Sequence, residues 1–174
     1  MATAHPNSLI LSTSVLRLLI TLNLIMGAAI ALLLIATFVA EGPVFHALGV
    51  PFALFSNRLF FGMRMIMLIG IAVVPIVHFV SKRLLLIITT VSTGNPFVVV
   101  NAQRLRAIAW SLLVLDLMHL FVGFIGSRIS AAGLPLHLSW GFSFTRCLAV
   151  LMLFVLAQVF EEGARMRDEL EGTV

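Results

Sequence analysis

The sequence predicts an all-α fold: a polytopic membrane bundle of about four transmembrane helices, with a cytoplasmic helical hairpin and a cytoplasmic C-terminal helix. Hydrophobic residues make up 61% of the 174 residues and charged residues 10%, whereas soluble domains contain about 45–50% and about 25%. Most of the charged residues stand at the ends of long apolar runs, as in membrane-spanning helices. The single cysteine excludes an internal disulfide. We expect residues 1–174 to form one transmembrane domain.

The first span is expected at residues 16–40. After Arg17 an uncharged run continues to Ala40, and as a helix this run is about 34 Å long. It is longer than the apolar region of about 7–15 residues in a cleavable signal peptide, so we expect it to be retained as a membrane anchor. Gly27 and Ala31, one turn apart, allow a second helix to pack closely against it.

The second span is expected at residues 59–81 and is followed by Lys82 and Arg83. Pro75 lies inside this span, where the missing N–H and the ring are expected to kink the helix. The remaining two spans are expected at residues 107–125 and 144–160.

Residues 82–106, between the second and third spans, are predicted to form the cytoplasmic helical hairpin. The apolar run from Leu84 to Val91 is too short to cross a bilayer, so we expect the second helix to continue through it and to end at Gly94. Asn95 and Pro96 are typical of an N-cap followed by proline at the first helical position. A helical face of apolar residues then leads into the third span: Val98, Ala102, Leu105, Ala109 and Leu112.

Lysine and arginine near the span ends predict the orientation. One side of the membrane receives Arg17, Lys82, Arg83, Arg104, Arg106, Arg165 and Arg167, and the other receives Arg58, Arg64, Arg128 and Arg146. The positive-inside rule therefore places both termini in the cytoplasm. Since membrane orientation accounts for these charges, the net charge of +4 does not indicate nucleic-acid binding, and no direct nucleic-acid partner is expected.

The C-terminal tail, residues 161–174, holds five of the seven acidic residues. As a helix it would form the i,i+4 pairs Glu161–Arg165, Arg165–Glu169 and Arg167–Glu171, each worth about 0.2–0.5 kcal/mol. These pairs are too weak to order the tail alone. A docking surface is needed, and either the pair Arg104 and Arg106 or another subunit would supply it.

Two motifs resemble a family of small bacterial membrane proteins, the domain of unknown function 2975. The first is Gly94-Asn95-Pro96-Phe97 followed by Asn101-Ala102-x-Arg104-Leu105-Arg106, and the second runs from Leu156 to Val174 and includes Met166-Arg167-Asp168-Glu169-Leu170. The resemblance implies a multi-pass protein of the bacterial cytoplasmic (inner) membrane, in a family often encoded beside a small helix-turn-helix regulator. It implies no activity and no catalytic residues.

Asp116 and His119 form the most prominent polar pair inside the predicted spans. They are three residues apart, so they share a face of the third helix near its middle. An ionisable residue there marks a functional site, such as a proton relay, by default. A structural contact with Arg64, Arg146 or Asn23 is the alternative that we favour, because the spans contain no second acid to continue a relay.

The sequence contains no motif typical of an enzyme or of a resident cofactor. A glycine-rich phosphate loop, a nucleophile elbow and a paired-histidine metalloprotease motif are all missing. His46, His137 and Glu41 share the outer side, but their spacing matches no compact ligand motif and zinc needs about four ligands. We therefore expect solvated loop histidines, no metal, no cofactor and no enzymatic activity.

We accordingly expect a non-enzymatic integral membrane interaction protein, a sensor or a membrane anchor for a cytoplasmic regulator protein. Alternatives are a small accessory subunit of a larger membrane complex and an oligomeric transporter or channel; a homo-oligomer is compatible with each. The lipid bilayer is the one partner common to all three. The residues expected to bind a partner are Asn95, Asn101, Arg104, Arg106, Arg165, Arg167, Asp168 and Glu169. The intramembrane polar residues of interest are Asp116, His119, Arg64 and Arg146.

Overall fold

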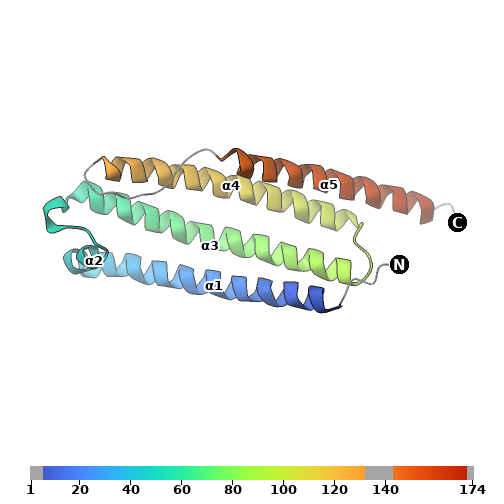
Figure 1. The fold of residues 1–174 in the computed structure, drawn as a ribbon, viewed down its shortest axis with the longest axis horizontal. Coiled ribbons are helices and arrows are strands. Elements are labelled where there is room, and N and C mark those ends of the chain that lie inside the picture. Colours follow the sequence, from blue (N-terminus) through green and yellow to red (C-terminus); the bar gives the residue numbers. More distant parts are fainter. Residues whose placement is uncertain (1–5, 132–142, 172–174) are drawn as a thin grey trace. The chain divides into compact units, whose positions relative to one another are not determined.

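The computed structural model describes residues 6–131 and 143–171, and these are mostly helical, with no β-strand among them (Figure 1). The helices are α1 (Pro6–Val39), α2 (Glu41–Ala47), the 3-10 helix η1 (Phe52–Leu54), α3 (Asn57–Ser92), α4 (Val99–Ser130) and α5 (Phe144–Glu171). In the described part of the chain, four helices are long and apolar enough to cross a membrane: Leu11–Val39, Asn57–Ser92, Val99–Ser130 and Phe144–Leu170. The predicted all-α membrane fold is confirmed.

The long helices extend past the predicted spans. α3 continues beyond Ser81 to Ser92, and α4 begins at Val99, so residues 82–106 consist of two helix ends and the turn between them. Residues 161–171 are the continuation of α5. Two short helices, α2 and η1, lie between α1 and α3 and were not predicted from the sequence.

Asn95 is not an N-cap, contrary to the expectation from the Asn-Pro pair. Gly94 has a φ of +81°, its N–H donates to the carbonyl of Val91 at 3.1 Å, and the N–H of Asn95 donates to the carbonyl of Thr90 at 3.2 Å. These two bonds and the left-handed glycine form a Schellman motif, so Asn95 belongs to the C-terminal cap of α3. α4 therefore starts later, at Val99.

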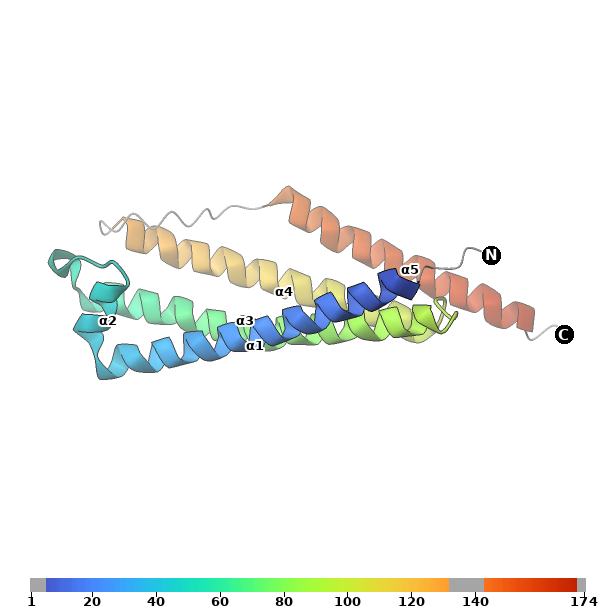
Figure 2. The same cartoon turned by 60° about the horizontal axis from the view of Figure 1, so that its bottom comes forward.

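Contacts divide the chain into two compact units, each built from parts of the long helices. One unit contains residues 23–75 and 115–142, and the other contains residues 1–22, 76–114 and 143–174. In the first unit, α2 is turned across the end of α1 (Figure 2). The hydrophobic core of this unit consists of Phe45, Val50, Leu59, Phe60 and Ile129. The rings of Phe45 and Phe60 are stacked, with 4.4 Å between their centroids.

In the same unit, α1 and α3 approach closely at Gly27. A Cβ atom built on Gly27 would lie 2.8 Å from Cγ2 of Val74, so only glycine fits there without a shift. One turn earlier, Nδ2 of Asn23 donates to the carbonyl of Val74 at 3.0 Å. Glycine at the crossing thus lets a polar side chain of α1 reach the backbone of α3 next to Pro75.

In the second unit, α5 packs on the N-terminal part of α4 through small and aliphatic side chains. Ala109 and Ala157 are fully buried, and Trp110 meets Phe154 edge-on with ring centroids 5.5 Å apart. The other buried apolar residues of α4 and α5 in this unit are Ala102, Leu105, Ile108, Val150 and Ala164. The helical face predicted from Val98 to Leu112 includes three of the buried positions of α4, at Ala102, Leu105 and Ala109.

Candidate interaction surface on α5

A polar network fixes the turn between α3 and α4. Asn101 is fully buried, and its Nδ2 donates to the carbonyl of Pro96 at 2.9 Å. Its Oδ1 accepts from Nη1 of Arg104 at 2.9 Å and lies 3.0 Å from Oγ1 of Thr90. Nη1 of Arg104 also donates to the carbonyl of Leu86 at 3.0 Å. Arg104 therefore joins α4 to the last turns of α3.

This turn and the start of α4 form the surface on which the end of α5 docks. Nη2 of Arg106 and Oε2 of Glu161 form a salt bridge of 2.8 Å. The ring of Phe97 lies 5.2 Å from the ring of Phe160. A Cβ atom on Gly163 would lie 2.9 Å from Cδ1 of Phe97, so glycine is needed for this close approach. Ala164, one residue on, is 1% exposed.

The docked end of α5 leaves two other faces exposed. Its charged face contributes Gln158, Glu161, Glu162, Arg165 and Asp168, which with Val99 of α4 line an open groove of about 440 Å³. The third face is apolar: Val159, Met166 and Leu170 are 55%, 52% and 71% exposed. Since these three residues follow the spacing i, i+7, i+11, they share one side of the helix.

The ion pairs on α5 differ in part from the predicted ones. Arg165 pairs with Glu169 at 3.7 Å, as the sequence predicts, and also with Glu162 at 2.7 Å. The predicted Glu161–Arg165 pair is wrong, because Glu161 forms its salt bridge with Arg106 of α4. The side chain of Glu171 lies outside the described residues, so the predicted Arg167–Glu171 pair stays a prediction.

The eight residues expected to bind a partner thus fall into two groups. Asn95, Asn101, Arg104 and Arg106 belong to the α3–α4 turn and the surface on which α5 docks, and of these only Arg106 is exposed. Arg165, Arg167, Asp168 and Glu169 are all exposed on the last turns of α5. Gly163, Phe97 and Glu161, which carry much of the docking, were not among the predicted residues. A glycine one turn after Phe160 was the sequence signal for this close contact.

The polar residues predicted inside the membrane have different surroundings. Arg64 donates from Nη2 to the carbonyl of Thr37 at 2.5 Å and to Glu41 at 3.1 Å, and its guanidinium lies 4.3 Å from the ring centre of Phe38. A carbonyl in the last turn of a helix lacks an intrahelical partner, so Arg64 caps the end of α1. Asp116 and Arg146 are half-buried and both have interaction partners, and His119 is exposed.

Of the three residues considered for a metal, the two that the structure describes have other contacts. The ring of His46 stacks on Phe52 at 4.6 Å, and Glu41 pairs with Arg64. His137 lies outside the described residues. Among the residues that the structure describes, no three histidine, cysteine, aspartate or glutamate side chains are placed to hold a metal ion.

Comparison with known proteins gives the family. Residues 33–174 match the family described as protein of unknown function DUF2975. The chain belongs to this family. The match covers α2 to α5 and therefore includes the docked end of α5 and the turn that receives it. No curated protein and no solved structure matches this membrane protein of the DUF2975 family.

Proposed function

We propose that this DUF2975 protein is a non-enzymatic integral membrane protein that anchors a soluble partner protein, such as a transcription regulator, at the cytoplasmic face of a bacterial inner membrane. One observation carries the proposal. α5 runs past its apolar part, which ends at Phe160, and continues to Glu171 as a docked helix with an exposed charged face.

Tertiary contacts hold this helix end in place. Its own ion pairs supply only a few tenths of a kcal/mol each. In addition, Gly163 approaches the ring of Phe97 in the α3–α4 turn closely, and Ala164 is buried. A surface that is fixed before binding loses less conformational entropy when a partner arrives. A charged segment that served only to keep the chain end in water would need no such docking.

The chemistry of the charged face indicates a basic partner. Three carboxylates, Glu161, Glu162 and Asp168, line the groove with a single arginine, Arg165. Arg106 pairs with Glu161 and Arg165 pairs with Glu162, so Asp168 is the carboxylate of the groove that we expect to meet a lysine or arginine of the partner first, with the exposed Glu162 beside it. Complementary charges of this kind speed encounter and fix the orientation of the bound protein.

Photo-crosslinking in the native host tests the proposal. A photoreactive phenylalanine analogue at Gln158, in the groove, is expected to give a discrete adduct with a soluble protein, and the double substitution Glu162→Lys/Asp168→Lys is expected to remove it. Gln103→Lys, at an exposed position of α4 outside the groove, is the matched control and should leave the adduct unchanged. No soluble adduct, or an adduct that survives the double substitution, would contradict the proposal.

The alternative of an accessory subunit is supported by the apolar face of α5. Val159, Met166 and Leu170 are exposed, and such a face fits either lipid or a neighbouring membrane helix. Gly27, in contrast, already packs on Val74 of the same chain. In this alternative, the photoreactive analogue at Met166 gives a discrete adduct with a membrane protein, and none forms from Gln158.

A further inference from the structure

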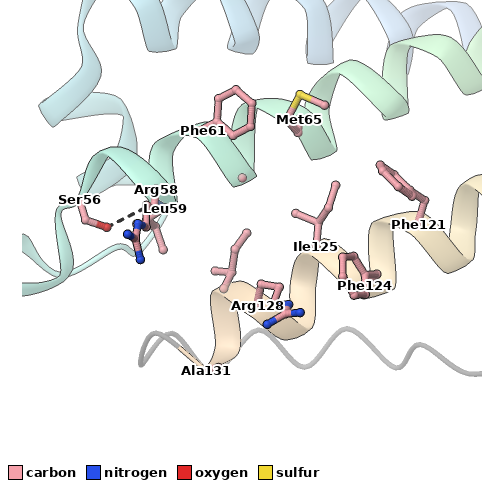
Figure 3. Close-up of a pocket in the computed structure, with 12 residues that line it drawn as sticks. Ser56, Arg58, Leu59, Phe61, Met65, Phe121, Phe124, Ile125, Arg128 and Ala131 are labelled. Atoms are coloured by element: carbon pink, nitrogen blue, oxygen red, sulfur yellow. Dashed lines mark hydrogen bonds between the residues drawn. The ribbon is translucent and has the colours of Figure 1, made fainter.

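A second groove lies in the other unit, between the start of α3 and the end of α4. It has a volume of about 610 Å³, which is in the range of small-molecule sites. Figure 3 shows side chains from both helices around it, with Met65 and Phe121 at one end and Arg58 and Arg128 at the other. The groove thus has a long apolar part and a basic end.

Close helix packing forms the base of this groove. A Cβ atom on Gly62 would lie 2.9 Å from Cδ1 of Ile129, and Leu59 and Ile129 are 3% and 4% exposed. The walls are more open, since Phe61 and Phe124 are 66% and 49% exposed. An apolar chain lying along these walls would cover them on a base that is already well packed.

The basic end carries positive charge that the described residues do not neutralise. No acidic residue lines the groove, and within the described residues neither Arg58 nor Arg128 forms a salt bridge. Of the two acids in this unit, Glu41 pairs with Arg64. The other, Asp116, is twelve residues before Arg128 on α4, a helical distance of about 18 Å.

Both arginines lie at the ends of helices that are long and apolar enough to cross a membrane. Arg58 is the second residue of α3, and Arg128 is two residues before the end of α4. Long basic side chains at such positions reach the polar surface of the bilayer while their stems stay among apolar groups. The guanidinium of Arg128 is also held over the ring of Phe124, with 5.2 Å to the ring centre.

We propose that this groove binds an anionic phospholipid of the surrounding bilayer, with the phosphate between Arg58 and Arg128 and one acyl chain along Phe61, Met65 and Phe121. Guanidinium groups match phosphate geometry and charge. The apolar walls match a hydrocarbon chain, which a soluble phosphate ester does not have. This inference does not depend on the proposed anchoring role, because the groove and the charged face of α5 belong to different units.

Native mass spectrometry of the full chain in mild detergent, titrated with phosphatidylglycerol or phosphatidylethanolamine, tests the charge. Arg58→Gln and Arg128→Gln are each expected to weaken phosphatidylglycerol binding about fivefold, and the double variant about 30-fold. Arg17→Gln, at an exposed position of α1 outside this unit, should bind as the parent does. Retained affinity in the double variant, or equal binding of both lipids by the parent, would overturn the proposal.

A second pair of variants tests the acyl chain. Met65→Trp fills the groove and should abolish phosphatidylglycerol binding, whereas Leu68→Trp, at a position 48% exposed and outside the groove, should not change it. Soluble glycerol phosphate is expected not to displace the lipid. Binding that persists in Met65→Trp, or displacement by glycerol phosphate, would show that no lipid chain occupies the groove. Thermal unfolding of each variant verifies that the fold is kept.

Discussion

Arg106 of α4 and Glu161 of α5 form a salt bridge of 2.8 Å between two positions 55 residues apart in the chain. It lies next to the contact between Phe97 and Gly163 and marks the edge where α5 docks. The acidic end of the chain is therefore partnered by a basic residue of the same chain. This salt bridge helps to hold the end of α5 against α4, so substitutions at Arg106 or Glu161 should change how firmly that end is docked.

Charge reversal at Arg106 should loosen this docked end. Arg106→Glu places a carboxylate against Glu161, so the pair becomes repulsive, and the swap Arg106→Glu/Glu161→Arg should restore attraction. Both side chains are about half exposed, so the attraction is worth only about 0.2–1 kcal/mol. Amide hydrogen exchange of residues 161–171 should be faster in the single variant and return toward the parent in the swap. Equal exchange in all three proteins would contradict the account.

Gly163 should tolerate no side chain while Phe97 is present. Its Cβ would lie 2.9 Å from Cδ1 of Phe97, and such overpacking costs about 1–3 kcal/mol. The matched experiment is Gly163→Ala in the background of Phe97→Ala, where alanine has room and the helix gains up to about 1 kcal/mol over glycine. Thermal unfolding should therefore show opposite signs for Gly163→Ala in the two backgrounds. The same sign in both would exclude this contact as the cause.

Removing the side chain of Asn101 should destabilise the α3–α4 turn. Asn101→Ala removes the hydrogen bonds of the buried Asn101 side chain to the carbonyl of Pro96 and to Arg104, and each such bond contributes about 0.5–1.5 kcal/mol. Gln103→Ala, two residues away and exposed, should change the unfolding temperature little. Similar losses in both variants would mean that the network does not hold the turn.

Two glycines of the other unit offer a matched test of helix packing. A Cβ on Gly27 would lie 2.8 Å from Val74, whereas a Cβ on Gly70 would lie 3.6 Å from Ile30, an ordinary contact. Because the β-branched side chain of Val74 has restricted rotamers in a helix, Gly27→Ala should destabilise by about 1–3 kcal/mol. Gly70→Ala should be neutral or stabilising. Unfolding in detergent compares them, and the reverse order would be inconsistent with the α1–α3 crossing.

The sequence predicted the class of fold and the long helices. Both follow from the share of apolar residues and from the length of each apolar run, which can be read along the chain without knowing its long-range contacts. It also indicated that the tail needs a docking surface. It was wrong about Asn95, because Gly94 completes a cap on the preceding helix and moves the start of α4 to Val99. It missed α2, where Pro43 falls in the first turn and is tolerated there.

The site was less predictable than the fold for a related reason. The i,i+4 spacing predicted a salt bridge between Glu161 and Arg165, but Glu161 forms its salt bridge with Arg106 of α4. Arg104 was assigned to partner binding with Arg106, yet its Nη1 donates to Asn101 and to the backbone of α3. Two arginines separated by one residue point to different sides of a helix. Which of them meets α5 depends on long-range packing, which spacing alone does not encode.

We propose that α5 must be docked in order to present its charged face to a partner. The direct measurement is photo-crosslinking from Gln158 in the native host, performed on the parent, on Arg106→Glu and on the swap Arg106→Glu/Glu161→Arg. We expect a discrete adduct with a soluble protein in the parent, a weaker adduct in the single variant, and recovery in the swap. An adduct of equal yield in all three proteins, or none in the parent, would contradict it.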